Sequence, residues 1–215
     1  MLTPPMNRPW VSANFAVSAD GKISTVDRKP AGWTSDADRE RFRELRRGVD
    51  ALLVGRGTWE TDRMTMLVRD QETQPLRCVV SRSGRFDPAH PMFAKPGGPI
   101  HLLVTGEKEP SSIPGATFHR ESLASFLGTL ARQYGVERLH CEGGGELLRE
   151  LAELDVLDEL HLTWAGHTLF GGREAPTITG VPGAFFPASR AFELVEFQPV
   201  EKSGECFLSY RRQRL

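Results

Sequence analysis

The residues RLHCEGGGELLREL, numbers 138–151, decide the class of fold. A short strand-like segment runs into three consecutive glycines, and leucines at helical spacing follow at once. This order predicts a strand, a tight turn and an amphipathic helix. Three glycines would let the backbone approach a phosphate closely, with the first N–H groups of the helix pointing toward it. The G-x-G-x-x-G fingerprint is absent, so the pattern alone is equally compatible with a turn that binds nothing.

Apolar segments elsewhere in the chain predict further strands. Residues 10–18 alternate between apolar and polar side chains, which is typical of a strand with one buried face. Short continuous apolar runs are typical of strands buried on both faces. Such runs occupy residues 49–55, 76–81 and 100–105, and further strand patterns follow at 157–166, 191–198 and 205–212. The last two have no helix between them, so they predict a closing antiparallel pair.

Two helices are expected between these strands. Thr34 or Ser35 can cap a helix that ends before Gly48, and residues 121–134 place apolar side chains at helical spacing before Gly135. The Pro- and Gly-rich connection 81–99 is expected to be a loop. Strands alternating with amphipathic helices predict an α/β protein with a largely parallel sheet. We expect one domain over residues 1–215, with its core between about residues 11 and 210.

Composition excludes several classes of function. The formal net charge is −1 over 215 residues, so no long-range field would attract nucleic acid or an anionic membrane. The three cysteines fit neither a disulfide framework nor a zinc site, and the six histidines form no ligand set, so no metal is expected. The N-terminus lacks a signal-peptide pattern, and no segment has the roughly 18 apolar residues of a membrane span. We therefore expect a cytoplasmic protein.

Several polar residues follow predicted strands and are candidates for binding. Glu142 enters the glycine turn, where it could accept hydrogen bonds from a substrate N–H or from its own turn. A second glycine turn, Gly55-Arg56-Gly57-Thr58, also follows a strand and would suit a phosphate or an amide, although such turns also occur for steric reasons. Open α/β sheets bind ligands at the carboxyl ends of their strands, which favours binding at both turns.

Arginines supply candidate anion sites, since Arg binds phosphate bidentately. Arg46, Arg69, Arg82 and Arg85 are candidates, although Arg46 would also suit a helix C-terminus without any ligand. Arg82 with Ser81 could hold the 2′-phosphate of NADP or could lie in a solvated turn.

Together, the segments ANFAVSADGKIS, LRRGVDALLVGRGTW, LHCEGGGELLREL and LDELHLTWAGHTLFGG resemble the riboflavin-biosynthesis 5-amino-6-(5-phosphoribosylamino)uracil reductase family. That family is the reductase half of a bifunctional deaminase-reductase. The resemblance runs from about Val11 to Tyr210. It implies a three-layer αβα, dihydrofolate-reductase-like fold with a mostly parallel mixed sheet and a C-terminal antiparallel pair. The zinc-deaminase signature is absent, so a stand-alone reductase is expected.

The resemblance also implies roles for individual residues, with NADPH as the cofactor. With Gly55, Ser81 and Arg82 added from the patterns above, the predicted cofactor site comprises Ala16, Trp33, Gly55, Thr58, Asp62, Ser81, Arg82, Gly143, Gly144, Gly145 and Glu146. The implied substrate site comprises Arg46, Met66, Arg69 and Glu142. Glu142 and Asp62 are the expected catalytic residues, because either could supply a proton, as bound water also could.

The implied reaction is transfer of hydride to C1′ of a phosphoribosylamino-pyrimidine, with the ring-opened Schiff base as acceptor. The chain departs from the family pattern at Arg63 and Met64, at Met66, and at Ala31, where a serine is common. These departures leave two alternatives open. One is a dihydrofolate, pterin or other heterocycle reductase of the same fold, and the other is a non-catalytic NADPH-binding module. The resemblance further implies a homodimer paired through its C-terminal strands.

Overall fold

The computed structural model describes residues 7–27, 32–107, 112–181, 186 and 188–214. Residues 1–6, at the N-terminus considered above, and the departure at Ala31 lie outside this part of the chain. The described chain divides into two compact units. Unit 1 comprises Met1–Trp10 and Leu45–Cys141, and unit 2 comprises Val11–Glu44 and Glu142–Leu215. A single domain over residues 1–215 stays a prediction.

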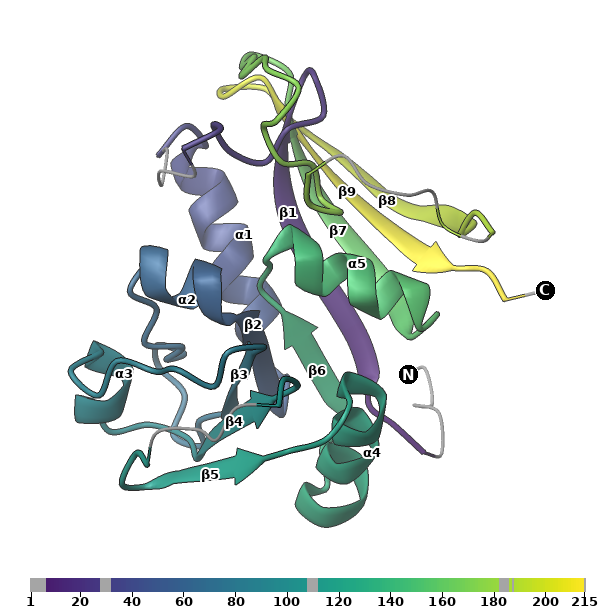
Figure 1. The fold of residues 1–215 in the computed structure, drawn as a ribbon. Coiled ribbons are helices and arrows are strands. Elements are labelled where there is room, and N and C mark those ends of the chain that lie inside the picture. The colour runs from purple at the N-terminus through teal and green to yellow at the C-terminus, as the bar shows by residue number, and fades with distance from the viewer. Residues whose placement is uncertain (1–6, 28–31, 108–111, 182–185, 187, 215) are drawn as a thin grey trace. The chain divides into compact units, whose positions relative to one another are not determined.

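Unit 1 is built on five parallel strands in the order β5-β4-β3-β2-β6 (Figure 1). The strands are β2 (Ala51–Gly55), β3 (Leu76–Ser81), β4 (Ile100–Val104), β5 (Ala116–His119) and β6 (Arg138–Cys141). The helices are α2 (Arg56–Thr61), α3 (Pro91–Ala94) and α4 (Leu123–Tyr134). Every residue of β4 is buried, as expected for a strand covered on both faces.

Local sequence explains where α4 begins and ends. Ser122 caps its first turn by accepting a hydrogen bond from the N–H of Ser125, and Gly135 ends it in the left-handed conformation with φ of +66°. Between these caps, Phe126 and Leu130 are completely buried. Burial of a large apolar side chain stabilises a fold by about 1.5–3 kcal/mol, so the apolar face of α4 accounts for its attachment.

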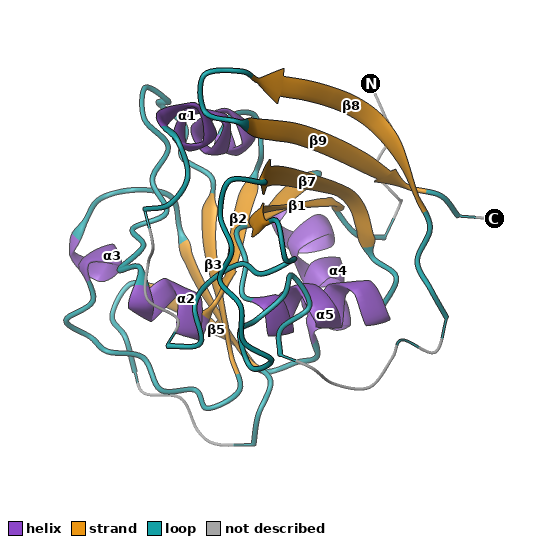
Figure 2. Cartoon of the chain, turned by 90° about the horizontal axis from the view of Figure 1, so that it is seen from above, coloured by secondary structure: helices purple, strands orange, loops and turns teal. Residues whose placement is uncertain are grey.

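Unit 2 contains the antiparallel part of the structure. Its strands are β1 (Trp10–Ser18, the first residue belonging to unit 1), β7 (Leu157–Ala165), β8 (Phe192–Val200) and β9 (Glu205–Arg212). Its helices are α1 (Asp36–Arg46, the last two residues belonging to unit 1) and α5 (Gly145–Glu153). β1 runs parallel to β7, β9 runs antiparallel to β7, and β8 runs antiparallel to β9, as Figure 2 shows. The predicted closing pair is therefore confirmed, as is the α/β class with mostly parallel strands.

Three local predictions were wrong or incomplete. The connection 81–99 is not wholly a loop, because α3 forms after His90, whose ring accepts a hydrogen bond from the N–H of Met92. The segment 55–58 is not a glycine turn, because α2 begins at Arg56 directly after an extended Gly55. Strand β5 had no counterpart among the predicted elements. Four residues are too few for a clear alternating pattern.

Two buried histidines lie side by side on neighbouring strands of unit 1. The Nδ1 atom of His101 on β4 lies 3.0 Å from the Nε2 atom of His119 on β5, and Tyr134 packs edge-on against His101. On its other side, His119 lies 3.6 Å from the carboxylate of Glu121. Burial, together with the neighbouring His119, lowers the pKa of His101 to about 4.

The fold should therefore lose stability in mild acid. In the unfolded chain, His101 has its ordinary pKa of 6.5, so it binds a proton more readily there than in the folded protein. The free energy of unfolding should therefore fall as the pH drops from about 6.5 toward 4. We expect a loss of about 1–2 kcal/mol between pH 7 and pH 5, measured by urea unfolding. His101→Gln should flatten this dependence, and an equally steep profile in that variant would contradict the assignment.

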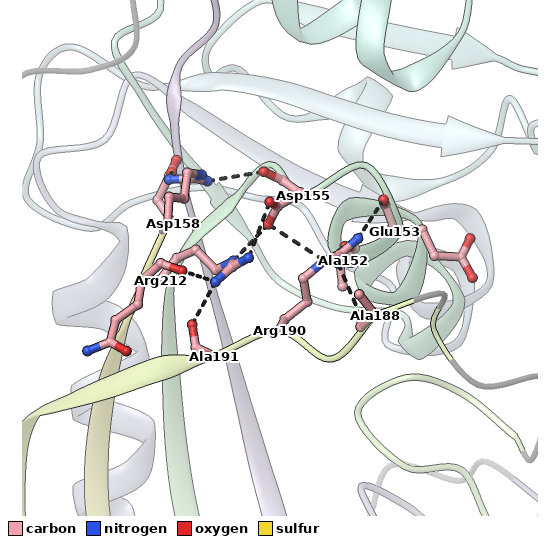
Figure 3. Close-up of polar contacts among 10 residues, drawn as sticks. Ala152, Glu153, Asp155, Asp158, Ala188, Arg190, Ala191 and Arg212 are labelled. Atoms are coloured by element: carbon pink, nitrogen blue, oxygen red, sulfur yellow. Dashed lines mark hydrogen bonds and ion pairs between the residues drawn. The ribbon is translucent and has the colours of Figure 1, made fainter.

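A cluster of ion pairs holds the turn between α5 and β7 in unit 2 (Figure 3). Asp155, in the left-handed conformation with φ of +52°, accepts two hydrogen bonds from Arg212, at 2.7 and 3.3 Å. Arg190 lies 3.6 Å from the same carboxylate and also donates to the backbone carbonyls of Ala152 and Glu153. Arg190 thus adds side-chain hydrogen bonds to carbonyl groups at the end of α5, where the helix itself supplies fewer donors.

Removing this carboxylate should destabilise unit 2 in a pH-dependent way. The hydrogen bond from Arg212 lowers the pKa of Asp155, so its contribution is present above the ordinary value of 3.8 and is lost as the pH falls further. We expect Asp155→Ala to cost about 1–2 kcal/mol more in unfolding free energy at pH 7 than near pH 2, where only the conformational cost of alanine at a positive φ remains. Asp155→Asn keeps a residue that suits the left-handed backbone but removes the charge. Comparing the two variants therefore separates the conformational part of the lost stability from the ionic part.

Among the described residues, no helix combines the length and apolar character needed to cross a membrane.

Candidate functional site

The predicted glycine turn lies in unit 2 at the start of α5. Gly143 and Gly144 have φ of +107° and +87°, conformations that residues with side chains rarely adopt. A Cβ on Gly143 would lie 3.4 Å from the ring of Phe15. The helix begins at Gly145, so its first N–H groups are those that lack partners within the helix. These features fit the cradle that a pyrophosphate requires.

The sequence suggested that Gly145 is a glycine so that a phosphate can approach the backbone, but the structure gives a different reason. A Cβ at this position would lie 2.4 Å from the backbone nitrogen of Gly180. Thr177 and Gly180 form a tight turn through reciprocal backbone hydrogen bonds of 2.7 and 2.9 Å, and this turn packs on the start of α5. The third glycine is therefore required by the protein's own backbone.

Two carboxylates flank the glycine turn. Glu142 directly precedes it and is buried, with 8% of its surface exposed. Glu146 is exposed in the first turn of α5, where a negative charge is favourable to the helix dipole. The carboxylate of Glu146 would repel a phosphate, so its backbone N–H is the part of this residue that suits an anion.

Ala16 and Trp33, the other predicted cofactor residues of unit 2, lie on β1 and on the segment before α1. Ala16 pairs with Thr163 of β7 and is half-buried. The Trp33 ring meets Phe170 edge-to-face, with centroids 4.9 Å apart and planes at 86°. The sequence alone did not indicate Phe170, because its contact with Trp33 joins parts of the chain that are far apart in sequence.

Unit 1 holds the predicted cofactor residues that follow β2. Gly55 ends β2 and caps α2, Thr58 lies within that short helix, and Asp62 ends it by donating its N–H to the carbonyl of Thr58 at 3.0 Å. Asp62 is exposed at the surface, and desolvation by the groups around its carboxyl raises the pKa of that carboxyl. This carboxyl therefore holds its proton to a higher pH than an ordinary aspartate.

Ser81 and Arg82 lie at the end of the neighbouring strand β3. The Ser81 hydroxyl accepts a hydrogen bond from the N–H of Gly84 at 3.1 Å, which closes a turn. Arg82 is exposed within this turn. Because β2 and β3 are parallel, with Gly55 opposite Val80, the residues after both strands lie at one edge of the sheet of unit 1. The structure therefore brings these two predicted parts of the cofactor site to the same edge.

The predicted substrate residues of unit 1 lie near the opposite edge of that sheet. Arg46 donates to the carbonyl of Leu67 at 3.3 Å. Arg69 is exposed and lines a groove with residues that precede β3 and β4, among them Gln74 and Pro99. A strand of five or six residues spans about 17–20 Å. The groove before β3 and β4 is therefore about one strand length away from the turns after β2 and β3.

Met66 is buried, with 1% of its surface exposed, and packs in the hydrophobic core of unit 1 with Trp59 and Val68. Its φ is +55°, an uncommon conformation for a methionine. Its side chain is therefore part of the core, which leaves the backbone as the part that suits a ligand.

No group of three or more His, Cys, Asp or Glu side chains within the described ranges is arranged to hold a metal ion.

Comparison with known proteins gives consistent results. Residues 9–202 match the family model of the RibD C-terminal domain. A curated relative from Archaeoglobus fulgidus, 2,5-diamino-6-ribosylamino-4(3H)-pyrimidinone 5′-phosphate reductase, is 31% identical over 93% of this chain and 96% of its own length.

Solved structures share the fold. RibD of Acinetobacter baumannii superimposes with a TM-score of 0.80 at 19% identity over 96% of this chain, which spans 58% of that protein's length. A dihydrofolate reductase of Enterococcus faecalis, in complex with NADP(H), superimposes with a TM-score of 0.54 at 17% identity, covering 95% of this chain and 96% of its own. The expected similarity to the dihydrofolate-reductase fold is thereby confirmed.

Proposed function

Because the chain belongs to the RibD C-terminal domain family, the reductases of riboflavin biosynthesis, we propose that it reduces a ribosylamino-pyrimidine 5′-phosphate with NADPH. A reductase of this family needs a nicotinamide cofactor, and NADPH is the form proposed here. The family match over residues 9–202, together with the relative from Archaeoglobus fulgidus, carries the proposal. That relative is named for the diaminopyrimidinone substrate, so we propose this compound ahead of the corresponding uracil.

The bound cofactor would supply the hydride. In unit 2, the backbone of Gly143 to Gly145 would bind the pyrophosphate, which the positive φ angles and the helix start support. Ala16, Trp33, Thr58 and Asp62 are the further residues proposed to contact the cofactor. Arg82, exposed after β3, would hold the 2′-phosphate that distinguishes NADPH from NADH.

The substrate's phosphate would be bound by Arg46 and Arg69 of unit 1. Arg69 lines the groove, and Arg46 donates to the carbonyl of Leu67, which also lines it. The reduced carbon gains the hydride, and the nitrogen of the former C=N bond gains a proton. We propose Asp62 as the proton donor, with Glu142 as the alternative, because desolvation raises the pKa of the Asp62 carboxyl and keeps its proton available to a higher pH. Asp62→Asn should then lower kcat more than it raises the KM of the substrate.

The test is anaerobic oxidation of NADPH followed at 340 nm. The diaminopyrimidinone phosphate, its uracil counterpart and dihydrofolate are offered separately, and each is repeated with NADH. The proposal expects turnover of the diaminopyrimidinone phosphate with NADPH preferred. Turnover of dihydrofolate alone would instead assign a heterocycle reductase, and binding of NADPH with no turnover of any of the three would assign a binding module.

We also propose that the chain forms a homodimer through β8. This strand is last in the strand order, and three of its apolar residues are substantially exposed, Leu194, Val195 and Phe197. An exposed apolar edge strand is prone to pair with another chain. Light scattering should give twice the 23.9 kDa of one chain, and Phe197→Glu should shift the mass toward one chain. A monomeric mass for the unaltered protein would contradict this proposal.

A further inference from the structure

A buried carboxylate in unit 2 holds the segment that carries Trp33. Glu205, the first residue of β9, has 1% of its surface exposed. One of its carboxylate oxygens accepts a hydrogen bond from the N–H of Ser35 at 2.8 Å. The other accepts from the Ser35 hydroxyl, in a short contact, and from the Ser203 hydroxyl at 3.1 Å. A buried carboxylate is tolerated only when it is satisfied in this way.

Ser35 is itself a structural anchor, because it caps the start of α1. Its hydroxyl accepts from the N–H of Asp38 at 3.2 Å, and its carbonyl accepts from the N–H of Arg39 at 3.2 Å. Glu205 therefore fixes the point where the chain enters α1, two residues after Trp33.

The loop that contacts the Trp33 ring also faces Glu205. His167 places its Nε2 atom 3.7 Å from the Glu205 carboxylate. Three residues further on, Phe170 meets the Trp33 ring edge-to-face. The N–H groups of Phe170 and Gly171 donate to the carboxylate of Asp20, at 3.2 and 2.7 Å, which keeps this loop in place. Trp33 is thus two residues from Ser35 in the chain and in ring contact with Phe170. Glu205 contacts Ser35 and also His167, which belongs to the same loop as Phe170.

We propose that Glu205 is a positioning residue for cofactor binding, which holds Trp33 in the orientation in which it contacts NADPH. The proposal rests on the proposed function, in which Trp33 contacts the cofactor. The physical basis is preorganisation: a side chain that is already ordered loses less conformational freedom when a ligand binds. Without Glu205, the Trp33 segment would have to be ordered by the cofactor itself, and affinity would fall.

Binding of NADPH to the purified full chain, measured by the change in NADPH fluorescence, tests the proposal. Glu205→Ala should raise the Kd about tenfold, in line with the cost of ordering one or two side chains. Glu205→Gln should recover most of the affinity, because its amide oxygen can accept from the Ser35 N–H while its NH₂ group donates to the two hydroxyls. The matched control is Glu201→Ala, an exposed carboxylate in the turn before β9, which should leave the Kd unchanged.

A double-mutant cycle separates positioning from a general structural role. If Glu205 acts through Trp33, Glu205→Ala should have little further effect on the Kd once Trp33→Ala is present. Equal losses with and without Trp33 would overturn the proposal, as would an unchanged Kd in Glu205→Ala. Should Glu205→Ala fail to fold, Ser35→Ala replaces it in the same cycle, since it removes one hydroxyl and keeps the backbone hydrogen bond.

The same titrations distinguish this inference from the proposed function. If the unaltered protein binds NADPH and Trp33→Ala weakens binding, while the Glu205 and Ser35 variants bind normally, only the positioning role fails. If the unaltered protein does not bind NADPH, both the positioning role and the proposed function are overturned.

Discussion

Gly145→Ala is expected to abolish NADPH binding and to lower the melting temperature of the protein by several degrees. The new Cβ would lie 2.4 Å from the nitrogen and 2.7 Å from the Cα of Gly180, and 2.9 Å from the carbonyl oxygen of Thr177. All three atoms are backbone, so the clash cannot be relieved by a change of rotamer. Overpacking of this kind costs about 1–3 kcal/mol or more, and each kcal/mol lowers the melting temperature by about 2–4 °C for a chain of this size.

Gly57→Ala is the matched control for stability. Gly57 lies within α2 and has no neighbouring atom within 4 Å of an added Cβ. Alanine is favoured over glycine in a helix by about 1 kcal/mol, so this variant should melt at the same temperature or higher. Circular dichroism gives both melting temperatures, and titration with NADPH gives the affinity of Gly145→Ala. Normal binding by that variant would show that the start of α5 is not part of the cofactor site.

Arg69→Ala is expected to raise the KM of the phosphorylated substrate about 10–100-fold with little change in kcat. An arginine bound to a phosphate contributes about 1.5–3 kcal/mol, and a contact made equally in the ground and transition states changes KM alone. Arg46→Ala should act in the same direction. Its contact with the carbonyl of Leu67 holds the segment that leads to Arg69.

The dephosphorylated substrate provides the control for this series. With no phosphate to bind, the unaltered protein and Arg69→Ala should give the same KM. Arg47→Ala removes an exposed arginine next to Arg46 and controls for the general loss of positive charge. A KM that rises equally with both forms of the substrate would show that Arg69 acts on the fold of the groove and not on the phosphate.

The sequence predicted well those features that depend on neighbouring residues. The run LRCVVS gave β3 with its bounds, and Gly135 marked the end of α4. The sequence could not predict α3, because its cap is His90, which lies outside the usual set of capping residues. Short helix α2 was also missed, since Gly55 at its cap and Gly57 in its first turn are typical of a turn.

The candidate site was predictable only in part, for a physical reason. Gly143 and Gly144 need their glycines because of local backbone conformation, which a run of glycines signals. Gly145 needs its glycine because of Gly180, and Ser35 is bound by Glu205, 170 residues away. Such contacts form only when the chain folds, so a single sequence carries no signal of them. Resemblance to a family assigned Met66 to a ligand, but it could not show that its side chain lies in the core.

The separation of the two groups of predicted binding residues in unit 1 has a consequence for how this chain can evolve. The turn at Ser81 and Arg82 and the groove at Arg69 lie at opposite edges of one sheet. Changes at sites more than about 10 Å apart generally contribute additively to free energies. Under the proposed function, substitutions around the groove can therefore accumulate and alter the choice of substrate while the affinity for the cofactor is inherited unchanged.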